Sequence, residues 1–121
     1  MRNTIINNQN GINGYGGYQI IEGNIIQNNQ IGIIEGGIVR NNTIAKSSIA
    51  IDNPSAYAVI YYNNIIDYSE NNIRLSQWDK FNVNATYNWW RTTDTTLIDQ
   101  TIHDFEDDFN LGKVHPHLNG A

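Results

Sequence analysis

The acidic residues of this 121-residue chain are the first place to look for chemistry, because paired carboxyl groups are the usual acid–base catalysts of glycoside cleavage. Such a pair must lie about 5 to 10 Å apart. Up to residue 70 most of the acidic residues are far apart in sequence, and only a repeating structure could bring distant ones together; they are Glu22, Glu35, Asp52, Asp67 and Glu70.

Metal binding is the second chemistry to consider. Asp104, Asp107 and Asp108 could offer several oxygen ligands to calcium, although a solvated turn is the more ordinary interpretation of such a cluster. Histidine ligands for zinc or copper are available at His103, His115 and His117, yet they lack a further ligand at a suitable spacing. We therefore expect no cofactor, with calcium as the one candidate.

Nucleophilic catalysis has little support in the sequence. The chain has no cysteine, and no Ser-His-Asp arrangement can be argued from its spacing. The absence of cysteine also excludes a disulfide framework and thiolate metal sites. The balance favours a non-catalytic protein.

Exposed aromatic side chains could bind carbohydrate, because aromatic faces stack on sugar rings. The chain has seven tyrosines and three tryptophans. Our candidates are Tyr15 and Tyr18 in the glycine-rich segment 11–18, and Tyr61 and Tyr62 near the middle of the chain. The alternative is that the glycine-rich segment is a plain turn and that about half of the tyrosines fill corners of the fold.

A unit that recurs about every 20 residues must position all of these side chains. Each copy starts at an asparagine and has isoleucines two and nine residues later. The starting positions are Asn3, Asn24, Asn42 and Asn64; the later ones are Ile5, Ile26, Ile44 and Ile66, then Ile12, Ile33, Ile51 and Ile73. A fifth, degenerate copy starts at Asn88 and has Trp90 at the second position.

This period and composition predict an all-β fold, a right-handed parallel β-helix solenoid of four to five coils. A unit near 20 residues is too short for a helix pair, and it is not leucine-rich. Its Ile, Val, Thr, Tyr, Gly and Asn suit short strands and the turns between them. Equivalent isoleucines would stack into a core, and equivalent asparagines would hydrogen-bond in a ladder. Residues 1–90 are predicted to form the coils.

Stacked coils lie roughly 4.8 Å apart, so residues at one position of the repeat become neighbours. No two carboxylates share a position, although Glu35 and Asp52 come close. Asp52 and Arg74 both stand ten residues after their asparagine, and we expect them to meet in an exposed salt bridge.

The last third of the chain changes character and predicts a cap over residues 91–121, within the same domain. Leu97, Ile98, Ile102 and Phe105 fall at helical spacing, with Asp94 or Thr95 able to cap the start of a short amphipathic helix. The preceding pair, Trp89 and Trp90, would lie at the seam between cap and coils, and Lys113-Val114 would form a last short strand. A solenoid needs such a cap to cover its last coil.

The repeats resemble the right-handed parallel β-helix repeats of pectin-lyase-like proteins. The C-terminal segment resembles the closing segment of β-helix domains in large secreted or cell-surface proteins of bacteria and archaea. The residues that carry this second resemblance are Asn88-Trp89-Trp90, Thr92-Thr93-Asp94, Ile98, Ile102, Asp104-Phe105 and 107–114.

Two departures from that pattern stand out: Arg91 replaces the glycine that usually follows the tryptophan pair, and the segment after Val114 is shorter than usual. The resemblance implies the fold and an extracellular or cell-surface setting. It does not imply one activity, because members of such families include lyases, hydrolases, binding modules and structural parts.

Composition restricts the partners. Only 16% of the residues are charged and the net charge is −5, so we expect no nucleic-acid partner, whose footprint is basic. No apolar run approaches a membrane span, so membrane insertion is not expected. The chain starts inside a repeat without an export signal, which predicts a fragment of a longer protein or a first coil covered by something else.

Three hypotheses follow. The chain is a structural or adhesive module; or it binds polysaccharide, as a binding module or the remnant of a lyase or hydrolase; or it self-assembles through its first coil. The third hypothesis predicts an apolar assembly edge at Ile5, Ile6, Ile12, Ile20 and Ile21. Asn41 and Asn84 also begin N-glycosylation sequons.

Overall fold

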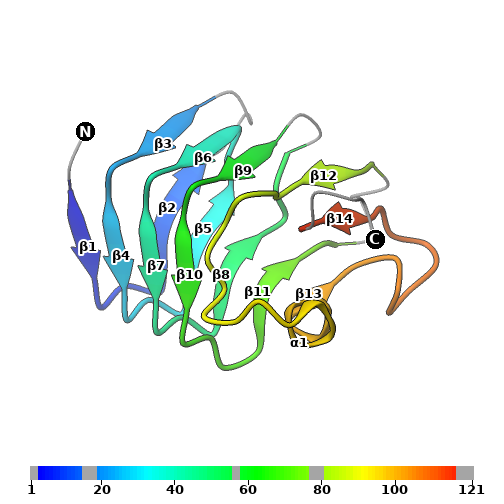
Figure 1. Ribbon diagram of the computed structural model, residues 1–121. Coiled ribbons are helices and arrows are strands. Elements are labelled where there is room, and N and C mark those ends of the chain that lie inside the picture. The colour runs from blue at the N-terminus through cyan, green and yellow to red at the C-terminus, as the bar shows by residue number, and fades with distance from the viewer. Residues whose placement is uncertain (1–2, 15–18, 56–57, 77–80, 117–121) are drawn as a thin grey trace.

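The isoleucine and asparagine columns close the chain into a parallel β-solenoid (Figure 1). The computed structural model describes residues 3–14, 19–55, 58–76 and 81–116. Short strands build three sheets, and each circuit of the chain, here called a coil, adds one strand to each sheet. All pairings between the named strands are parallel, as expected when successive coils run in the same direction.

The three sheets are named here by their strands. Sheet A is β1 (Thr4–Ile6), β4 (Ile25–Gln27), β7 (Thr43–Ala45) and β10 (Asn64–Ile66). Sheet B is β2 (Asn10–Gly14), β5 (Ile31–Glu35), β8 (Ile49–Asp52), β11 (Asn71–Arg74) and β13 (Ile102–His103). Sheet C is β3 (Ile20–Glu22), β6 (Ile38–Arg40), β9 (Val59–Tyr61), β12 (Val83–Asn84) and β14 (Val114–His115).

The all-β solenoid prediction is confirmed. Four coils are stacked, which corresponds to about three turns from the first coil to the fourth, so their number lies at the lower end of the four to five predicted. After Asn88 the chain leaves the regular repeat to form the short helix α1 (Thr95–Gln100) and the two-residue strands β13 and β14. These late strands extend sheets B and C without building another complete coil.

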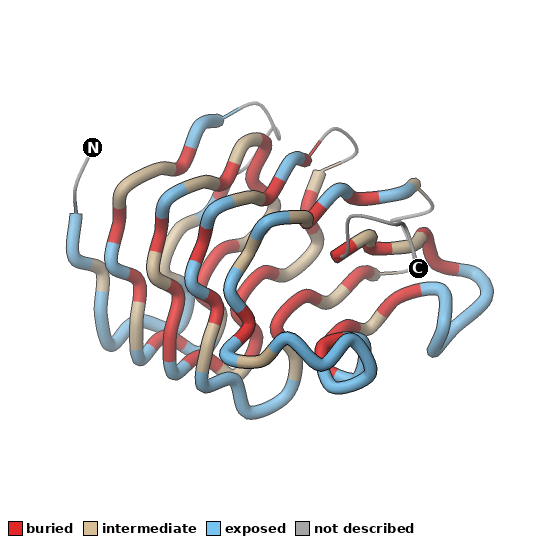
Figure 2. Tube along the Cα trace, in the orientation of Figure 1, coloured by how far each residue is buried: buried red, intermediate tan, exposed pale blue. Residues whose placement is uncertain are grey.

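The core is a set of isoleucine columns, one per sheet, enclosed by the coils (Figure 2). Each column follows the strand register, so side chains of one type stack on each other and exclude water. In sheet A the column is Ile5, Ile26, Ile44 and Ile65; in sheet B it is Ile12, Ile33, Ile51, Ile73 and Ile102; in sheet C it is Ile21, Val39 and Ile60.

An asparagine ladder runs along the corner that leads from sheet C into sheet A. The Oδ1 atom of Asn42 accepts from the backbone N and the Nδ2 of Asn24, both at 3.0 Å. Asn63 Oδ1 accepts in the same way from Asn42, at 3.0 and 3.1 Å, and Asn88 Oδ1 from Asn63, both at 3.0 Å. Each amide thus satisfies buried backbone groups of its neighbours.

The fourth ladder position is Asn63, so the prediction of Asn64 at that position is wrong. Asn64 is exposed in β10, and Ile65 rather than Ile66 enters the core column. The doublets Asn63-Asn64 and Ile65-Ile66 satisfy the two-residue spacing in either register, and the nine-residue spacing to Ile73 favours Asn64. A shift of one residue reverses which strand face is buried, and only packing decides it.

A second polar column forms at the corner between sheets A and B. Asn29 Oδ1 accepts from the backbone N of Asn8 at 2.9 Å, and its Nδ2 donates to Ile5 O at 3.1 Å. In the next coil Ser47 occupies the position equivalent to Asn29, and its buried Oγ has no hydrogen-bond partner in the described part of the chain. The shorter side chain ends the second ladder after two amides.

The structure of the C-terminal cap agrees in part with the prediction from the sequence. Asp94 caps α1, its Oδ1 accepting from the backbone N of Thr96 at 3.0 Å and of Leu97 at 3.4 Å. The helix ends at Gln100, and Ile102 pairs with Ile73 as a strand residue, so helical spacing over 97–105 was wrong beyond that point. Trp90 is buried against the core, whereas Trp89 is half exposed.

In the residues that the structure describes, no helix combines the length and apolar character needed to span a bilayer.

Candidate functional site

The predicted pairing of Asp52 with Arg74 is confirmed on the outer face of sheet B. Arg74 donates from Nε to Asp52 Oδ1 at 3.0 Å and from Nη2 to Oδ2 at 2.9 Å, and this hydrogen bonding raises the pKa of Arg74. His103 is the next residue in the same row, beside Arg74. This row lines a shallow hollow of about 380 Å³ that Asp108 also lines.

The hollow does not offer a free pair of carboxyl groups for acid–base chemistry. Both oxygens of Asp52 are engaged by the Arg74 guanidinium in a bidentate ion pair. Asp108 Oδ1 accepts from the backbone N of Asn110 at 3.0 Å and from its Nδ2 at 3.1 Å. Both aspartates therefore stabilise local structure, and the row is best described as an exposed ion pair beside a turn.

The three aspartates of the predicted calcium site shape the turn between β13 and β14. Asp104 is 4% exposed; its Oδ2 accepts from Val114 N at 2.8 Å and its Oδ1 from Glu106 N at 3.1 Å. Asp107 Oδ2 accepts from Asp104 N at 3.1 Å. Among the described residues no group of three or more His, Asp or Glu side chains is placed to hold a metal ion.

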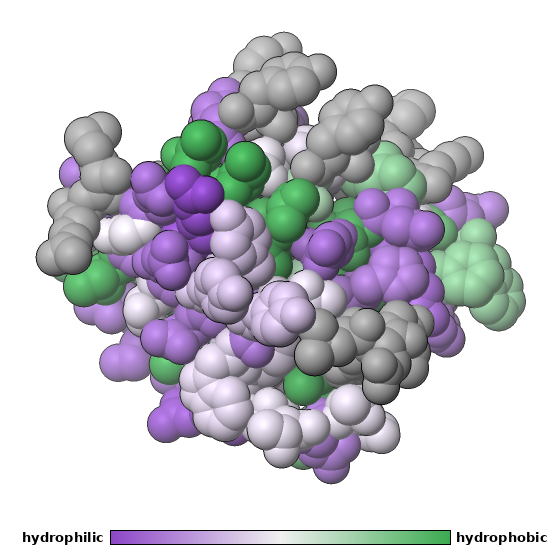
Figure 3. Space-filling view, turned by 45° about the horizontal axis from the view of Figure 1, so that its top comes forward, coloured by the Kyte–Doolittle hydropathy of each residue, from purple (hydrophilic) through white to green (hydrophobic). Residues whose placement is uncertain are grey.

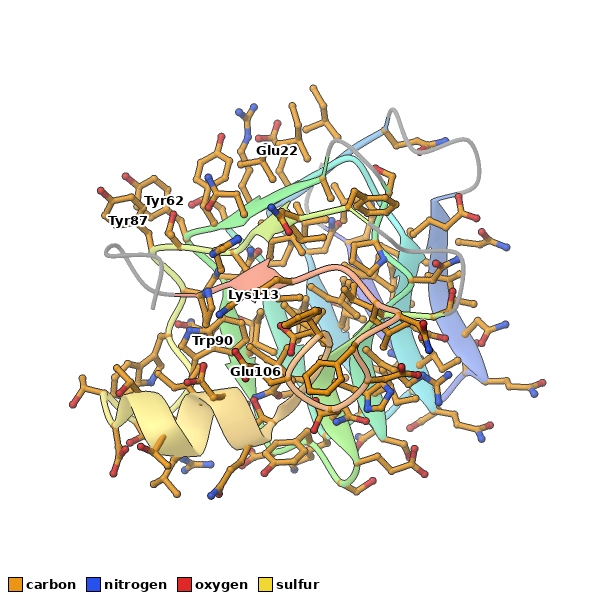
Figure 4. The ribbon with its side chains drawn as sticks, turned by 90° about the vertical axis from the view of Figure 1, so that its right-hand side faces the viewer. Glu22, Tyr62, Tyr87, Trp90, Glu106 and Lys113 are labelled. Carbon is orange, nitrogen blue, oxygen red and sulfur yellow. The ribbon has the colours of Figure 1, made fainter. Side chains whose placement is uncertain are left out.

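Burial raises the pKa of Asp104, with smaller raising effects from the charges of Asp107 and Glu106, while the backbone N–H donors of Val114 and Glu106 act in the opposite direction. Glu106 also accepts from Lys113 Nζ at 3.0 Å (Figure 4), which raises the pKa of that lysine. The Asp104 carboxylate therefore links β14 to the preceding turn by hydrogen bonds, and its burial disfavours the charged form.

We expect the Asp104→Asn variant to change how stability depends on pH. A raised folded pKa means that the contribution of Asp104 is fully present below its unfolded pKa of about 3.9 and is lost as the pH rises through the folded pKa. Urea unfolding from pH 3 to pH 7 should therefore show the wild type losing stability relative to the variant as the pH rises. If the stability of the wild type relative to the variant stayed constant or increased as the pH rises, the expectation would be contradicted. Asn110→Ala, which changes no titratable group, is the control.

The corner that carries the asparagine ladder also holds a row of linked side chains that crosses four coils. Arg40 donates from Nε to Glu22 Oε2 at 2.7 Å and from Nη1 to Tyr61 Oη at 3.0 Å. Hydrogen bonding to Tyr61 and then to Glu22 raises the pKa of Arg40, and Arg40 in turn lowers the pKa of Glu22. The strand register places these three residues side by side in β3, β6 and β9.

Two exposed tyrosines continue this row. The ring of Tyr62 lies edge-on to Tyr61 with centroids 5.1 Å apart, and Tyr87 in the next coil lies 5.8 Å from Tyr62 at a tilt of 42°. Tyr62 is 59% and Tyr87 58% exposed, and Figure 4 shows both projecting from one corner. We call Tyr61, Tyr62 and Tyr87 the tyrosine row.

Tyr62 and Tyr87 occupy a backbone conformation that tyrosine rarely adopts. Their φ angles are 57° and 62°, in the left-handed region. The equivalent residues of the two preceding coils are Asn41 at 56° and Gly23 at 71°, types that tolerate this conformation. A bulky residue there costs roughly 1–2 kcal/mol, and its ring gains little burial in return. Glu35, Lys46 and Arg91 hold similar angles at other corners, so it is the two exposed rings at these angles, and not the angle alone, that make this corner a candidate site.

A short row of apolar side chains lies on the face beside the tyrosine row. Ile20, Ile38 and Val59 stack in register on the outside of sheet C, and Ile20 is 55% exposed. Figure 3, in which the top of the molecule comes forward, shows apolar side chains gathered among polar ones on this face. These side chains widen the apolar surface next to the rings, although a large contiguous patch would be needed to mark a binding surface by itself.

Sequence reasoning found Tyr61 and Tyr62 but missed Tyr87, Glu22 and Arg40. The signal was available, because Tyr62 and Tyr87 each precede a ladder asparagine, and Glu22, Arg40 and Tyr61 each stand two residues before one. The comparison of repeat positions covered the carboxylates and Arg74, but not Arg40 or the tyrosines. The candidates Tyr15 and Tyr18 lie outside the described residues, so the carbohydrate hypothesis for them stays a prediction.

The predicted assembly edge lies on the first coil, whose strands are the outermost of their sheets in the described part of the chain. Ile21 is buried, Ile5 and Ile12 are half-buried against the core, and Ile6 and Ile20 are exposed. Ile12, Ile20 and Ile21 line a hollow together with Asn3, Glu22 and Asn24. Self-assembly through this edge stays a prediction.

A comparison of the chain with protein-family models, with curated proteins and with solved structures finds no match, so the chemistry of the tyrosine row is what points to a function.

Proposed function

We propose that this chain is a non-catalytic β-solenoid module of an extracellular or cell-surface protein, and that it is adhesive through polysaccharide bound at the tyrosine row. The observation that carries the proposal is the pair Tyr62 and Tyr87, exposed aromatic rings held at strained corners of neighbouring coils.

The non-catalytic part of the proposal is supported by how the carboxylates are used. Asp52 and Glu22 are paired with arginines, and Asp104 and Asp108 accept backbone N–H groups of the cap. A glycoside hydrolase needs a general acid and a second carboxylate aimed at the same bond. The groups named here are instead committed to holding the fold.

The setting is supported by the resemblance of the repeats and of the segment from Asn88 onward to exported β-helix proteins. The residue at which this chain departs from that pattern, Arg91, has a φ of 68°. Glycine is the residue best suited to such an angle, which is compatible with the glycine that usually follows the tryptophan pair in the resembling segments. The arginine is accommodated there and pairs with Asp67.

The polysaccharide ligand is supported by the chemistry of the row. Aromatic rings offer apolar faces and edges to the C–H groups of a sugar, and the tyrosine hydroxyl groups and Arg40 offer hydrogen bonds to its hydroxyls. The rings are preorganised, because Arg40 fixes Tyr61, Tyr61 contacts Tyr62, and Tyr62 contacts Tyr87. Preorganisation lowers the entropic cost of binding.

The test replaces both exposed tyrosines with the residue that the solenoid itself uses at this corner. The Tyr62→Asn/Tyr87→Asn variant should lose binding to polysaccharide by at least about tenfold, and each substitution should raise the free energy of unfolding by roughly 0.5–1 kcal/mol as strain is relieved. Binding is measured by isothermal titration calorimetry with soluble glucan, chitin oligomers and polygalacturonate, and stability by urea unfolding.

Tyr68→Ala is the matched control, because Tyr68 is an exposed tyrosine of the same coil at another corner. It should bind as the wild type does. Retention of binding by the double asparagine variant would overturn the proposed site, and a wild type that binds none of the three polysaccharides would overturn the adhesive role. Release of reducing or unsaturated sugar ends by the wild type would overturn the non-catalytic assignment.

A further inference from the structure

The corner that bears Tyr62 and Tyr87 is one straight column that crosses four coils. Its residues are Gly23, Asn41, Tyr62 and Tyr87, each immediately before a ladder asparagine. Backbone hydrogen bonds run down the column: Gly23 N donates to Asn41 O at 3.1 Å, Asn41 N to Tyr62 O at 3.1 Å, and Tyr62 N to Tyr87 O at 2.9 Å. The column is therefore a rigid line across the strands.

The chemistry of this column changes halfway along. In the two coils nearer the C-terminus the corner is occupied by the rings of Tyr62 and Tyr87. In the two coils before them the corner residues are small, Gly23 and Asn41, and the side chains beside them are Glu22 and Arg40. An aromatic half thus continues into a polar half, with Arg40 linking the two through the Tyr61 hydroxyl.

We infer that the ligand of this site is an extended neutral glycan of about four sugar units that lies along the solenoid axis. Neighbouring coils are roughly 4.8 Å apart, close to the length of one sugar ring in an extended chain, so successive sugars meet successive coils. Two sugars contact Tyr62 and Tyr87, and the next two present hydroxyl groups to Arg40, Asn41 and Glu22. This inference rests on the proposed polysaccharide-binding role.

The neutral character of the ligand follows from the pairing of charges. The charge of Arg40 is already balanced by Glu22 at 2.7 Å, so a sugar carboxylate that approached the guanidinium would also meet the like charge of Glu22 beside it. The chain as a whole carries a net charge of −5, which repels an acidic polysaccharide. A carboxylate and a guanidinium side by side, by contrast, accept from and donate to sugar hydroxyl groups without any charge on the ligand.

The test is a length series. Calorimetric titration with β-1,4-linked oligomers of glucose and of N-acetylglucosamine, from two to six units, should show affinity that rises at least about tenfold from two to four units and is then constant. A matching series of oligogalacturonates should bind at least about tenfold more weakly at every length.

Two paired variants locate the polar half. Glu22→Gln/Arg40→Gln should weaken binding of the four- and six-unit oligomers about fivefold and leave the two-unit oligomer unchanged. The control is Asp52→Asn/Arg74→Gln, which removes the equivalent ion pair on sheet B and should leave every affinity unchanged.

The outcomes separate this inference from the proposal on which it rests. Affinity that is independent of length, or a preference for oligogalacturonate, overturns the inference and leaves the tyrosine row as a binding site. Equal loss at all lengths in Glu22→Gln/Arg40→Gln also overturns it, because the pair would then act only by holding Tyr61. Failure of every oligomer and every polymer to bind overturns both.

Discussion

Replacing Asn63 with alanine is expected to lower the free energy of unfolding by about 3–5 kcal/mol. Asn63 is 1% exposed, and its amide serves two neighbouring coils at once. Its Oδ1 accepts from the backbone N and the Nδ2 of Asn42, and its Nδ2 donates to Val39 O at 2.9 Å and to Asn88 Oδ1 at 3.0 Å. Alanine would leave the backbone N of Asn42 without this acceptor and remove one hydrogen bond each from Asn42 Nδ2, Val39 O and Asn88 Oδ1; an unpaired buried group costs about 1–3 kcal/mol.

The matched control is the adjacent residue. Asn64→Ala removes the same side chain from an exposed position of β10 and should change stability by no more than about 0.5 kcal/mol. Urea unfolding of the two variants, followed by circular dichroism, gives the comparison directly. Equal losses, or a larger loss for Asn64→Ala, would show that the ladder does not run through Asn63.

The fold was predictable because its determinants repeat. Isoleucines two and nine residues after an asparagine identified the columns of sheets A and B in the first three coils, and the strand register confirms them. In the fourth coil Ile73 stands ten residues after Asn63, and a doublet of asparagines hides the difference. Spacing cannot resolve such a choice, since it depends on which side chain the core accepts.

The tyrosine row was only half predictable, for a different reason. Tyr61 and Tyr62 stand out in the sequence as a pair, but Tyr87 is 25 residues from Tyr62, and only the stacking of the coils brings the two rings together. The left-handed corner that holds both tyrosines is a backbone property. Composition gives no sign of it, because tyrosine is an unfavourable residue for that angle.

The cap shows how tertiary contacts override a periodic pattern. Leu97, Ile98, Ile102 and Phe105 predict one helix, yet Thr101 ends it by donating from Oγ1 to Ile98 O at 2.7 Å. Ile102 then joins sheet B beside Ile73, where it is buried. The edge of the last coil offers unpaired backbone groups, and a strand satisfies more of them than a second helical turn could.

Substituting Gly112 with alanine should disrupt the packing of the cap against the last coil. We expect the free energy of unfolding to fall by more than about 3 kcal/mol. A Cβ atom at this position would lie 1.7 Å from Phe81 O, 2.6 Å from Phe81 C and 2.7 Å from Phe81 N. All three are backbone atoms, so no side-chain rotation can relieve the clash. Either residue 81 or the segment that carries Gly112 must move.

The segment that moves is the one that closes sheet C. Val83 N donates to Lys113 O at 2.8 Å and Ala85 N to His115 O at 2.9 Å, so β14 is held to β12 on both sides of Val114. Displacement of Gly112 would break these bonds and the bond from Val114 N to Asp104. Hydrogen exchange at the Val83 and Ala85 amides should therefore accelerate at least tenfold, while the Thr43 and Asn64 amides of sheet A remain protected.

The comparison variant is Asn110→Ala, an exposed change two residues earlier in the same turn, which should leave stability within about 0.5 kcal/mol and exchange unchanged. Wild-type exchange rates at Val83 and Ala85 in Gly112→Ala would contradict a role for this close approach. The physical reason for so large an effect is the solenoid itself. Each coil is protected by the next, so the last coil depends on β14, and β14 reaches it because residue 112 has no side chain.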